Sequence, residues 1–120
     1  MTVPEITQKR IALNEVKFRN SNEVIEATAD ELDLEGLVPF ICECPLPDCK
    51  EIVRLTLDEY QDVRKHPARF FNGPGHERIS VEAGTGKVVA RTPRYVLVEK
   101  IGSAAQIAVN NSPKPAGPDV

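Results

Sequence analysis

Residues 42–49 read Cys42-Glu43-Cys44-Pro45-Leu46-Pro47-Asp48-Cys49, and this stretch holds all three cysteines of the 120-residue chain. Cysteines that only fill a core behave as small apolar side chains and have no reason to cluster. An odd number of cysteines, without any sign of an oxidising compartment, also argues against disulfides. Three thiols on one tight turn are typical of a metal site, so we expect Cys42, Cys44 and Cys49 to be metal ligands.

A fourth ligand has to come from elsewhere in the chain, which has two histidines. His76 follows a Gly-Pro-Gly sequence, where glycine lets the backbone bend closely around an ion. His66 lies at the expected end of a short helix, close to Lys65 and Arg69, whose positive charges disfavour a cation site. At a helix C-terminus a histidine instead suits the helix dipole. We predict that His76 is the fourth ligand and keep His66 as the alternative.

Zn²⁺ is the expected cofactor, because structural zinc sites accept three cysteines and one histidine. Such an ion would pin loop 42–49 to turn 73–76 and stabilise a small core. Two alternatives stay open. A [2Fe–2S] cluster on three Cys and one His occurs in the CDGSH iron–sulfur proteins, which have a longer gap between cysteines than this chain. A thiol redox sensor would release zinc when Cys42 or Cys44, close to Lys50, is oxidised.

The N-terminal third of the sequence predicts one long helix over residues 1–36. Thr2-Val3-Pro4-Glu5 has the pattern of a capping box, and Gly36 supplies a stop. About 30 helical residues extend about 45 Å, which we expect to exceed the length of the remaining globular part. Half of the helix would then lack a core in its own chain. Asn14, Asn20 and Asn22 interrupt its apolar stripe, which argues against a regular coiled coil. We still expect a protein partner or a homodimer through Ile11, Phe18 and Ile25.

Residues 37–102 predict a metal-stapled α+β domain. Strands are expected over residues 38–42, 51–55, 68–71, 87–91 and 94–100, the last two forming a hairpin. Thr56-Leu57-Asp58-Glu59 is a capping box that begins the one short helix of this domain. A short helix is expected over residues 103–109, and the Pro-rich residues 110–120 predict a disordered tail. The predicted fold class is therefore α+β, with a long N-terminal helix and a small zinc-stapled antiparallel β-part.

The net charge of −3 conceals an asymmetry, because residues 64–100 hold eight Lys or Arg against three Asp or Glu. A basic half of this kind can bind nucleic acid or an acidic partner. The bases are scattered over strands and turns, however, so this role is the alternative function. Its candidate contacts are Arg64, Lys65, Arg69, Arg91 and Arg94.

Several function classes lack their sequence signals. The longest apolar runs, such as residues 95–98, are far shorter than the roughly 20 residues that span a bilayer. The first residues lack the layout of a secretory signal, so a cytoplasmic protein without a membrane partner is expected. EAGTGK at 82–87 has the glycines and lysine of a phosphate loop but not its full pattern, and we expect no enzyme. The leading hypothesis is a small zinc-binding protein that acts as a non-enzymatic interaction or regulatory module.

Four segments carry a resemblance: FICECPLPDC (40–49), LTLDEYQDVRKHPARFF (55–71), GPGHE (73–77) and RYVLVEK (94–100). In this order and spacing, the chain resembles a group of small bacterial proteins, mainly actinobacterial, that share a Cys-x-Cys-x4-Cys … Gly-His pattern. The resemblance covers about residues 14–101 and includes Asn14-Glu15, Phe18-Arg19 and Asn22-Glu23. It implies that His76 is the natural partner of the cysteines, and it implies no activity. This chain departs from the group by extra residues around 82–87.

Overall fold

A computed structural model describes residues 5–111, with side chains from Lys9 onward. It is an α+β fold of nine elements, with principal extents of 45 × 32 × 24 Å. These elements are α1 (Glu5–Glu31), β1 (Val38–Ile41), β2 (Ile52–Leu55), α2 (Leu57–Arg64), β3 (Arg69–Asn72), α3 (Glu77–Glu82), β4 (Gly86–Arg91), β5 (Val96–Lys100) and α4 (Gly102–Asn111). The predicted fold class is confirmed, with one addition: helix α3, which the sequence analysis did not predict.

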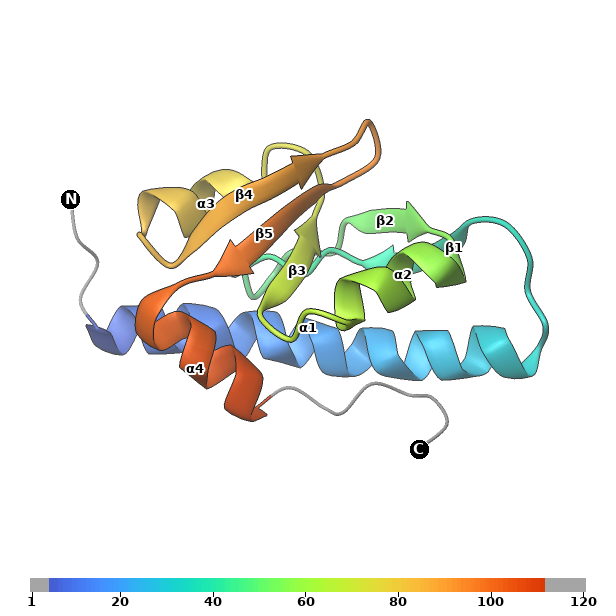
Figure 1. Ribbon diagram of the computed structural model, residues 1–120, viewed down its shortest axis with the longest axis horizontal. Helices are drawn as coiled ribbons and strands as arrows, with labels where there is room; N and C mark the ends of the chain where they lie inside the picture. Colours follow the sequence, from blue (N-terminus) through green and yellow to red (C-terminus); the bar gives the residue numbers. More distant parts are fainter. Residues whose placement is uncertain (1–4, 112–120) are drawn as a thin grey trace.

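Two small antiparallel sheets lie along one side of helix α1 (Figure 1). Strands β1 and β2 form the first, and the second has the order β3-β5-β4. Helix α4 packs on the N-terminal half of α1 (Figure 1). The predicted capping box at Thr2 lies outside the described residues. Of the predicted tail, residues 110 and 111 belong to α4, and the rest lies outside the description.

The apolar core is centred on three aromatic rings from β1, α2 and β3. Phe40 and Tyr60 stack with ring centroids 4.4 Å apart, and Phe71 meets both rings edge-on. The capping box of α2 is present as predicted: Glu59 N donates to Thr56 Oγ1, and Thr56 N donates to Glu59 Oε1. A fixed helix start orients Tyr60, which stacks on Phe40, and so helps to position β1, the strand that precedes the cysteines.

Helix α1 buries a face that is largely polar. Apart from one adjacent pair, buried residues recur at intervals of three or four along it: Ala12, Glu15, Val16, Arg19, Asn22, Glu26 and Ala29. Buried polar groups need partners, and three of these residues find them in distant segments. Glu15 meets Lys100 with Oε1 and Nζ 2.6 Å apart, and Arg19 meets Glu43. Asn22 exchanges two 2.8 Å hydrogen bonds with the backbone of Ile41 on β1.

This buried face corrects the expectation that half of the helix has no core of its own chain. The burial runs from Ala12 to Ala29, because α4 covers the N-terminal half and the β-part covers the rest. The helix also ends at Glu31 rather than near residue 36. The predicted interface residues Ile11, Phe18 and Ile25 are half-buried within the chain itself. The observation that motivated a helix-mediated partner is therefore absent from this fold.

Candidate metal centre

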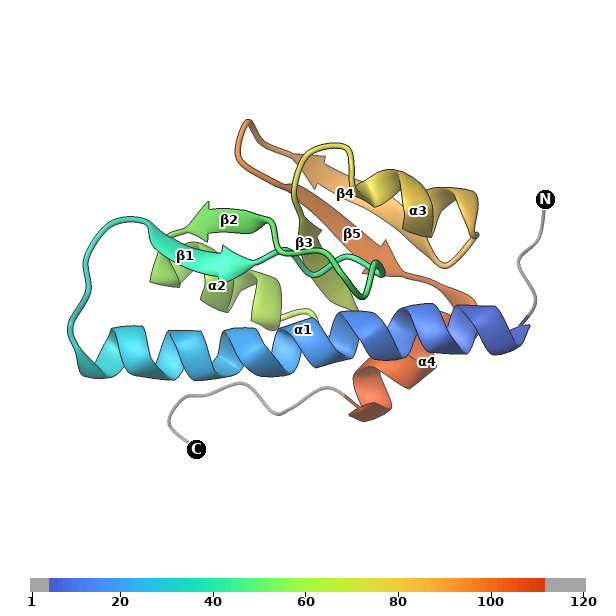
Figure 2. The same cartoon turned by 180° about the vertical axis from the view of Figure 1, so that it is seen from behind.

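The structure brings the four predicted metal-site residues together. One ligand atom from each of Cys42, Cys44, Cys49 and His76 lies within 4.8 Å of all the others. Cys42 and Cys44 follow strand β1, Cys49 precedes β2, and His76 directly precedes α3. The loop between β1 and β2 passes close to α1 (Figure 2). It is held on both sides, since Asn14 Nδ2 of α1 donates to Pro45 O at 3.1 Å and Cys49 Sγ lies 3.5 Å from His76 Nδ1.

The distances fit one tetrahedral ion. A Zn–S bond of about 2.3 Å and a Zn–N bond of about 2.0–2.1 Å, at a tetrahedral angle, place sulfur and nitrogen about 3.5 Å apart. His76 Nδ1 lies 3.6 Å from Cys42 Sγ and 3.5 Å from Cys49 Sγ. One ring nitrogen carries a single hydrogen or a single lone pair, so it cannot form two full hydrogen bonds of this kind. Equal distances to two sulfurs are instead typical of ligands around a shared centre.

The turn before α3 presents the imidazole to the cysteines. His76 N donates to Gly73 O at 3.0 Å, and Gly75 adopts φ +97°, which favours glycine. Gly75 N also donates to Glu77 Oε1 at 2.8 Å, which fixes the turn to the first residue of the helix. His76 stands at the N-cap position of α3 but makes no side-chain capping bond. Its ring is therefore available to the cysteine loop.

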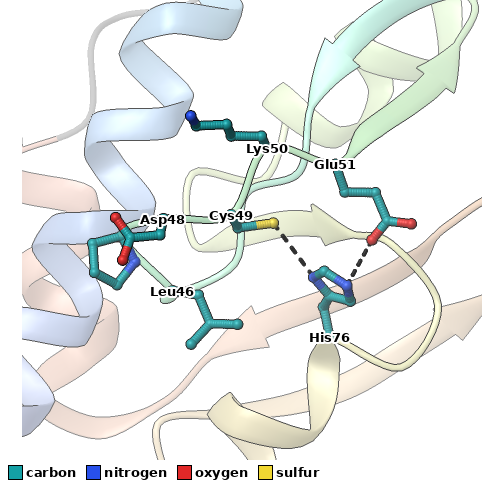
Figure 3. A pocket seen from close by; sticks show the side chains of 7 residues that line it. Leu46, Asp48, Cys49, Lys50, Glu51 and His76 are labelled. Atoms are coloured by element: carbon teal, nitrogen blue, oxygen red, sulfur yellow. Dashed lines mark hydrogen bonds and ion pairs between the residues drawn. The ribbon is translucent and has the colours of Figure 1, made fainter.

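The second ring nitrogen of His76 contacts a carboxylate that the sequence analysis did not single out. Nε2 lies 2.6 Å from Glu51 Oε2, on the side of the ring away from Cys49 (Figure 3). Cys42 N donates to Glu51 O at 3.0 Å, so the backbone of Glu51 continues the β1–β2 ladder opposite a predicted ligand. A strand-register argument from Cys42 across the predicted hairpin is the signal that could have found Glu51.

The three thiols do not titrate independently. The pKa of Cys44 is lowered to about 5, chiefly by a hydrogen bond from Cys42, and the same contact raises the pKa of the Cys42 thiol. Burial raises the pKa of Cys49, and the Cys44 thiolate raises the pKa of His76. Gly73 N donates to Cys42 Sγ at 3.2 Å. A zinc ion bound here would stabilise the thiolate form of all three cysteines.

Glu43, between two of the predicted ligands, is anchored to α1 and β3. Its carboxylate accepts from Arg19 Nε and Nη2, both at 2.8 Å, from Asn22 Nδ2 at 3.1 Å and from Phe71 N at 3.3 Å. The Arg19 guanidinium lies 4.1 Å from the centroid of the Phe70 ring. Arg19 and Glu43 are both fully buried. This network holds the Cys42–Cys44 segment to the rest of the fold.

The centre has a buried side and an accessible side. Cys42 and Cys44 are fully buried, while Cys49 and His76 are partly exposed at a surface pocket of about 340 Å³. Leu46, Pro47, Asp48, Lys50 and Glu51 complete the lining of this pocket. His66, the alternative ligand, is exposed at the end of α2 and does not belong to the cluster. Small molecules in solution can therefore reach Cys49 and His76 without unfolding the loop.

The five predicted nucleic-acid contacts do not form one uncompensated patch. Each has a carboxylate partner: Arg64 with Glu23, Lys65 with Asp62, Arg69 with Glu99, Arg91 with Glu77 and Arg94 with Glu59. Arg64 is also buried. Phosphate binding draws on cations that can exchange counterions for phosphate, and at these five positions a phosphate would compete with an existing ion pair.

Within residues 5–111, no helix combines the length and apolar character needed to cross a bilayer. Comparisons with protein-family models, with curated proteins and with solved structures found no match for this chain.

Proposed function

We propose that this protein binds one Zn²⁺ ion through Cys42, Cys44, Cys49 and His76, and that the ion stabilises its fold. The observation that carries the proposal is the convergence of three sulfurs and one nitrogen within 4.8 Å. The widest separation in that set exceeds the tetrahedral S–S edge of about 3.8 Å by no more than about 1 Å, which side-chain rotation can close. In a [2Fe–2S] cluster the ligands are divided between two irons, which requires a wider set.

The ion would link three segments that are far apart in sequence: the end of β1, the loop before β2 and the turn before α3. Such a link supplies folding free energy that a small core by itself does not provide. Four protein ligands fill a tetrahedral shell, so a reaction at the ion would first have to displace one of them. This arrangement supports a structural role for the ion.

The test is elemental analysis of the purified protein together with its absorption spectrum. One zinc per chain and no visible colour is the expected result. Cobalt substitution should then give the intense d–d bands of a tetrahedral, thiolate-rich site. Iron with visible absorption would replace the zinc proposal with a redox cofactor. A folded protein that binds neither metal would overturn the proposed centre.

We extend the proposal to the role of the whole protein, a non-enzymatic module for protein interaction or regulation. The support is a short segment between α1 and β1 in which Leu32, Leu34 and Leu37 are 64%, 48% and 49% exposed. Exposed apolar side chains grouped in this way are typical of contact surfaces. This segment replaces the long helix as the proposed interface, and a second copy of the chain is the simplest partner.

Sedimentation velocity over a range of concentrations tests the dimer. We expect self-association that Leu34→Lys with Leu37→Lys abolishes. Val109→Lys is the matched control, because Val109 is 46% exposed on α4, a different element. A monomer at every concentration would contradict the homodimer.

A second candidate, the thiol redox sensor, is favoured by the partial exposure of Cys49 beside two fully buried thiols. Hydrogen peroxide would reach Cys49 first and convert its thiolate to a sulfenic acid, with loss of a zinc ligand. Zinc release by mild peroxide, followed with a chromogenic chelator, tests this role. Cys49→Ser should remove the fast phase of release, and zinc retention by the peroxide-treated parent would contradict the sensor.

A further inference from the structure

We infer that Glu51 is a positioning residue of the metal centre: its carboxylate holds His76 in the tautomer and orientation that present Nδ1 to the ion. The inference rests on the proposed zinc site and adds a residue to it. It starts from the geometry of the ring, whose Nδ1 faces two sulfurs at 3.5–3.6 Å while Nε2 lies 2.6 Å from Glu51 Oε2 (Figure 3).

The chemistry of imidazole gives this contact its consequence. A neutral histidine carries one ring proton, and the nitrogen without that proton is the only one that can bind a metal. An ionised carboxylate has no proton to donate and can only accept a hydrogen bond. The contact with Glu51 therefore places the imidazole proton on Nε2. The lone pair is then on Nδ1, toward the cysteines. Carboxylate partners of this kind orient metal-binding histidines and increase their basicity.

Glu51 reaches the ring because the cysteine strand itself positions it. Strands β1 and β2 pair in a register that sets Ile41 opposite Ile52, and the next pair along is Cys42 and Glu51. Residues directly opposite one another in an antiparallel pair project from the same face of the sheet. The hydrogen bond from Cys42 N to Glu51 O therefore also positions the Glu51 side chain at the same site.

Gly73 provides the space that this carboxylate occupies. A Cβ atom at position 73 would lie 2.7 Å from Glu51 Oε2 and 3.0 Å from Glu51 Cδ, with the three nearest atoms all belonging to Glu51. Gly73 does not adopt a left-handed backbone conformation, so an alanine fits its dihedral angles. The absence of a side chain at Gly73 permits this close approach of Glu51. Alanine at this position would displace the Glu51 side chain, while the hydrogen bond from Gly73 N to Cys42 Sγ would stay in place.

The first experiment compares Glu51→Ala and Glu51→Gln with Asp48→Ala and Asp48→Asn. Asp48 is the matched control because it is an exposed carboxylate in the same loop and lines the same pocket, while its side chain points away from His76. Zinc affinity is measured by competition with a chromogenic chelator. We expect Glu51→Ala to weaken zinc binding about 10–100-fold. The zinc affinity of Glu51→Gln should lie between those of the parent and Glu51→Ala, because the uncharged amide oxygen still accepts a hydrogen bond from Nε2. Both Asp48 variants should bind zinc as tightly as the parent.

A spectroscopic readout separates positioning from general stability. Long-range ¹H–¹⁵N correlation spectra of the zinc-loaded parent should show Nδ1 as the metal-bound nitrogen and a slowly exchanging proton on Nε2. In Glu51→Ala this proton should exchange rapidly with solvent. A residue that only stabilised the fold would lower the melting temperature without changing the exchange of the Nε2 proton.

Gly73→Ala reaches the same contact by an independent route. It should weaken zinc binding in the parent but cause no further loss in the Glu51→Ala background, because the side chain it displaces is already gone. This non-additivity is the signature of a shared contact. Additive losses would mean that Gly73 acts on the site without Glu51.

The outcomes distinguish the two proposals. A parent protein that binds no zinc overturns the proposed centre itself. A parent that binds zinc, with Glu51→Ala as tight as Asp48→Ala, leaves the centre standing and overturns the role of Glu51. If Glu51→Ala fails to fold, the affinity and Nε2 exchange of Glu51→Gln and Gly73→Ala decide, and parent-like values in both would overturn the inference.

Discussion

Arg19 of helix α1 and Glu43 of the cysteine loop form a fully buried, bidentate ion pair, with both nitrogen–oxygen distances at 2.8 Å. Glu43 lies between Cys42 and Cys44, so the pair ties the long helix to the segment that carries half of the proposed ligand set. Arg19 also donates to the carbonyl of Arg69, the first residue of β3. In the same strand, Phe71 O accepts from Glu43 N of the cysteine loop. The helix and the candidate metal centre thus share one buried polar network.

Removing the cation of this pair should be costly. In Arg19→Met the carboxylate of Glu43 stays buried without its main partner, which typically destabilises a protein by about 3–5 kcal/mol. Urea unfolding of the metal-loaded protein measures the loss. Lys65→Met is the control, because the Lys65–Asp62 pair is 72% exposed at both ends and should contribute less than about 1 kcal/mol. Equal effects of the two substitutions would mean that the buried pair does not hold α1.

Cys44→Ser should unfold the protein or lower its melting temperature sharply. Structural zinc contributes roughly 10–16 kcal/mol in zinc-finger peptides, which is comparable with the whole stability of a domain. Circular dichroism during heating, with and without a strong chelator, checks this. The chelator should bring the parent down to the level of Cys44→Ser and leave the variant unchanged. A variant as stable as the parent would exclude a structural metal.

The two histidines should separate cleanly in metal retention. His76→Ala removes one of the four converging ligand atoms, whereas His66→Ala changes an exposed residue outside the cluster. We expect one zinc per chain in His66→Ala and strongly weakened binding in His76→Ala, by elemental analysis after dialysis against a weak chelator. The reverse order would overturn the ligand assignment.

Glu26→Gln should stabilise the protein at alkaline pH and have little effect in acid. Burial, followed by the charge of Glu23, raises the pKa of Glu26 to about 7 from 4.5. A raised folded pKa means that the native state binds the proton more tightly, so stability is full below about pH 4.5 and falls as pH rises toward 7.

The neutral amide avoids this cost, by on the order of 1–3 kcal/mol above pH 7. Because Glu15 and the metal centre also respond to pH, the measured quantity is the difference between variant and parent in urea unfolding at pH 5 and pH 8. A difference that does not change between these two values would show that Glu26 remains ionised in the native state.

Local patterns predicted the parts of this protein that depend on neighbours in sequence. The capping box at Thr56, the hairpin of β4 and β5 and the clustered cysteines are all short-range signals. Helix α3 was missed because its six residues, between two glycine-containing turns, are too few to show a helical period. The long helix was expected to have about 30 residues, and α1 has 27 described residues. Its N-terminal half is covered by α4, a contact that helix length alone does not reveal.

The polar residues of α1 show where pattern reasoning reaches its limit. Asn22 interrupts the apolar stripe, and Glu15 and Arg19 do not belong to it, yet all three are buried. A helical pattern can assign an apolar side chain to a core. A charged side chain is buried only where another segment of the chain supplies an oppositely charged or hydrogen-bonding partner. Those partners, Lys100, Glu43 and the backbone of Ile41, lie 19 to 85 residues away in sequence.

By itself, the sequence predicted the α+β class and the candidate metal-binding residues, with His76 preferred to His66, because clustered cysteines and a glycine-containing turn are local features with known chemistry. The tertiary structure decided between the two histidines by placing His76 beside the cysteines. The tertiary structure alone decided which face of α1 is buried, that Glu43 is neutralised by Arg19, and that Glu51 meets the imidazole of His76. Each of these depends on strand register and helix packing, which bring together groups whose burial is tolerated only when they are paired.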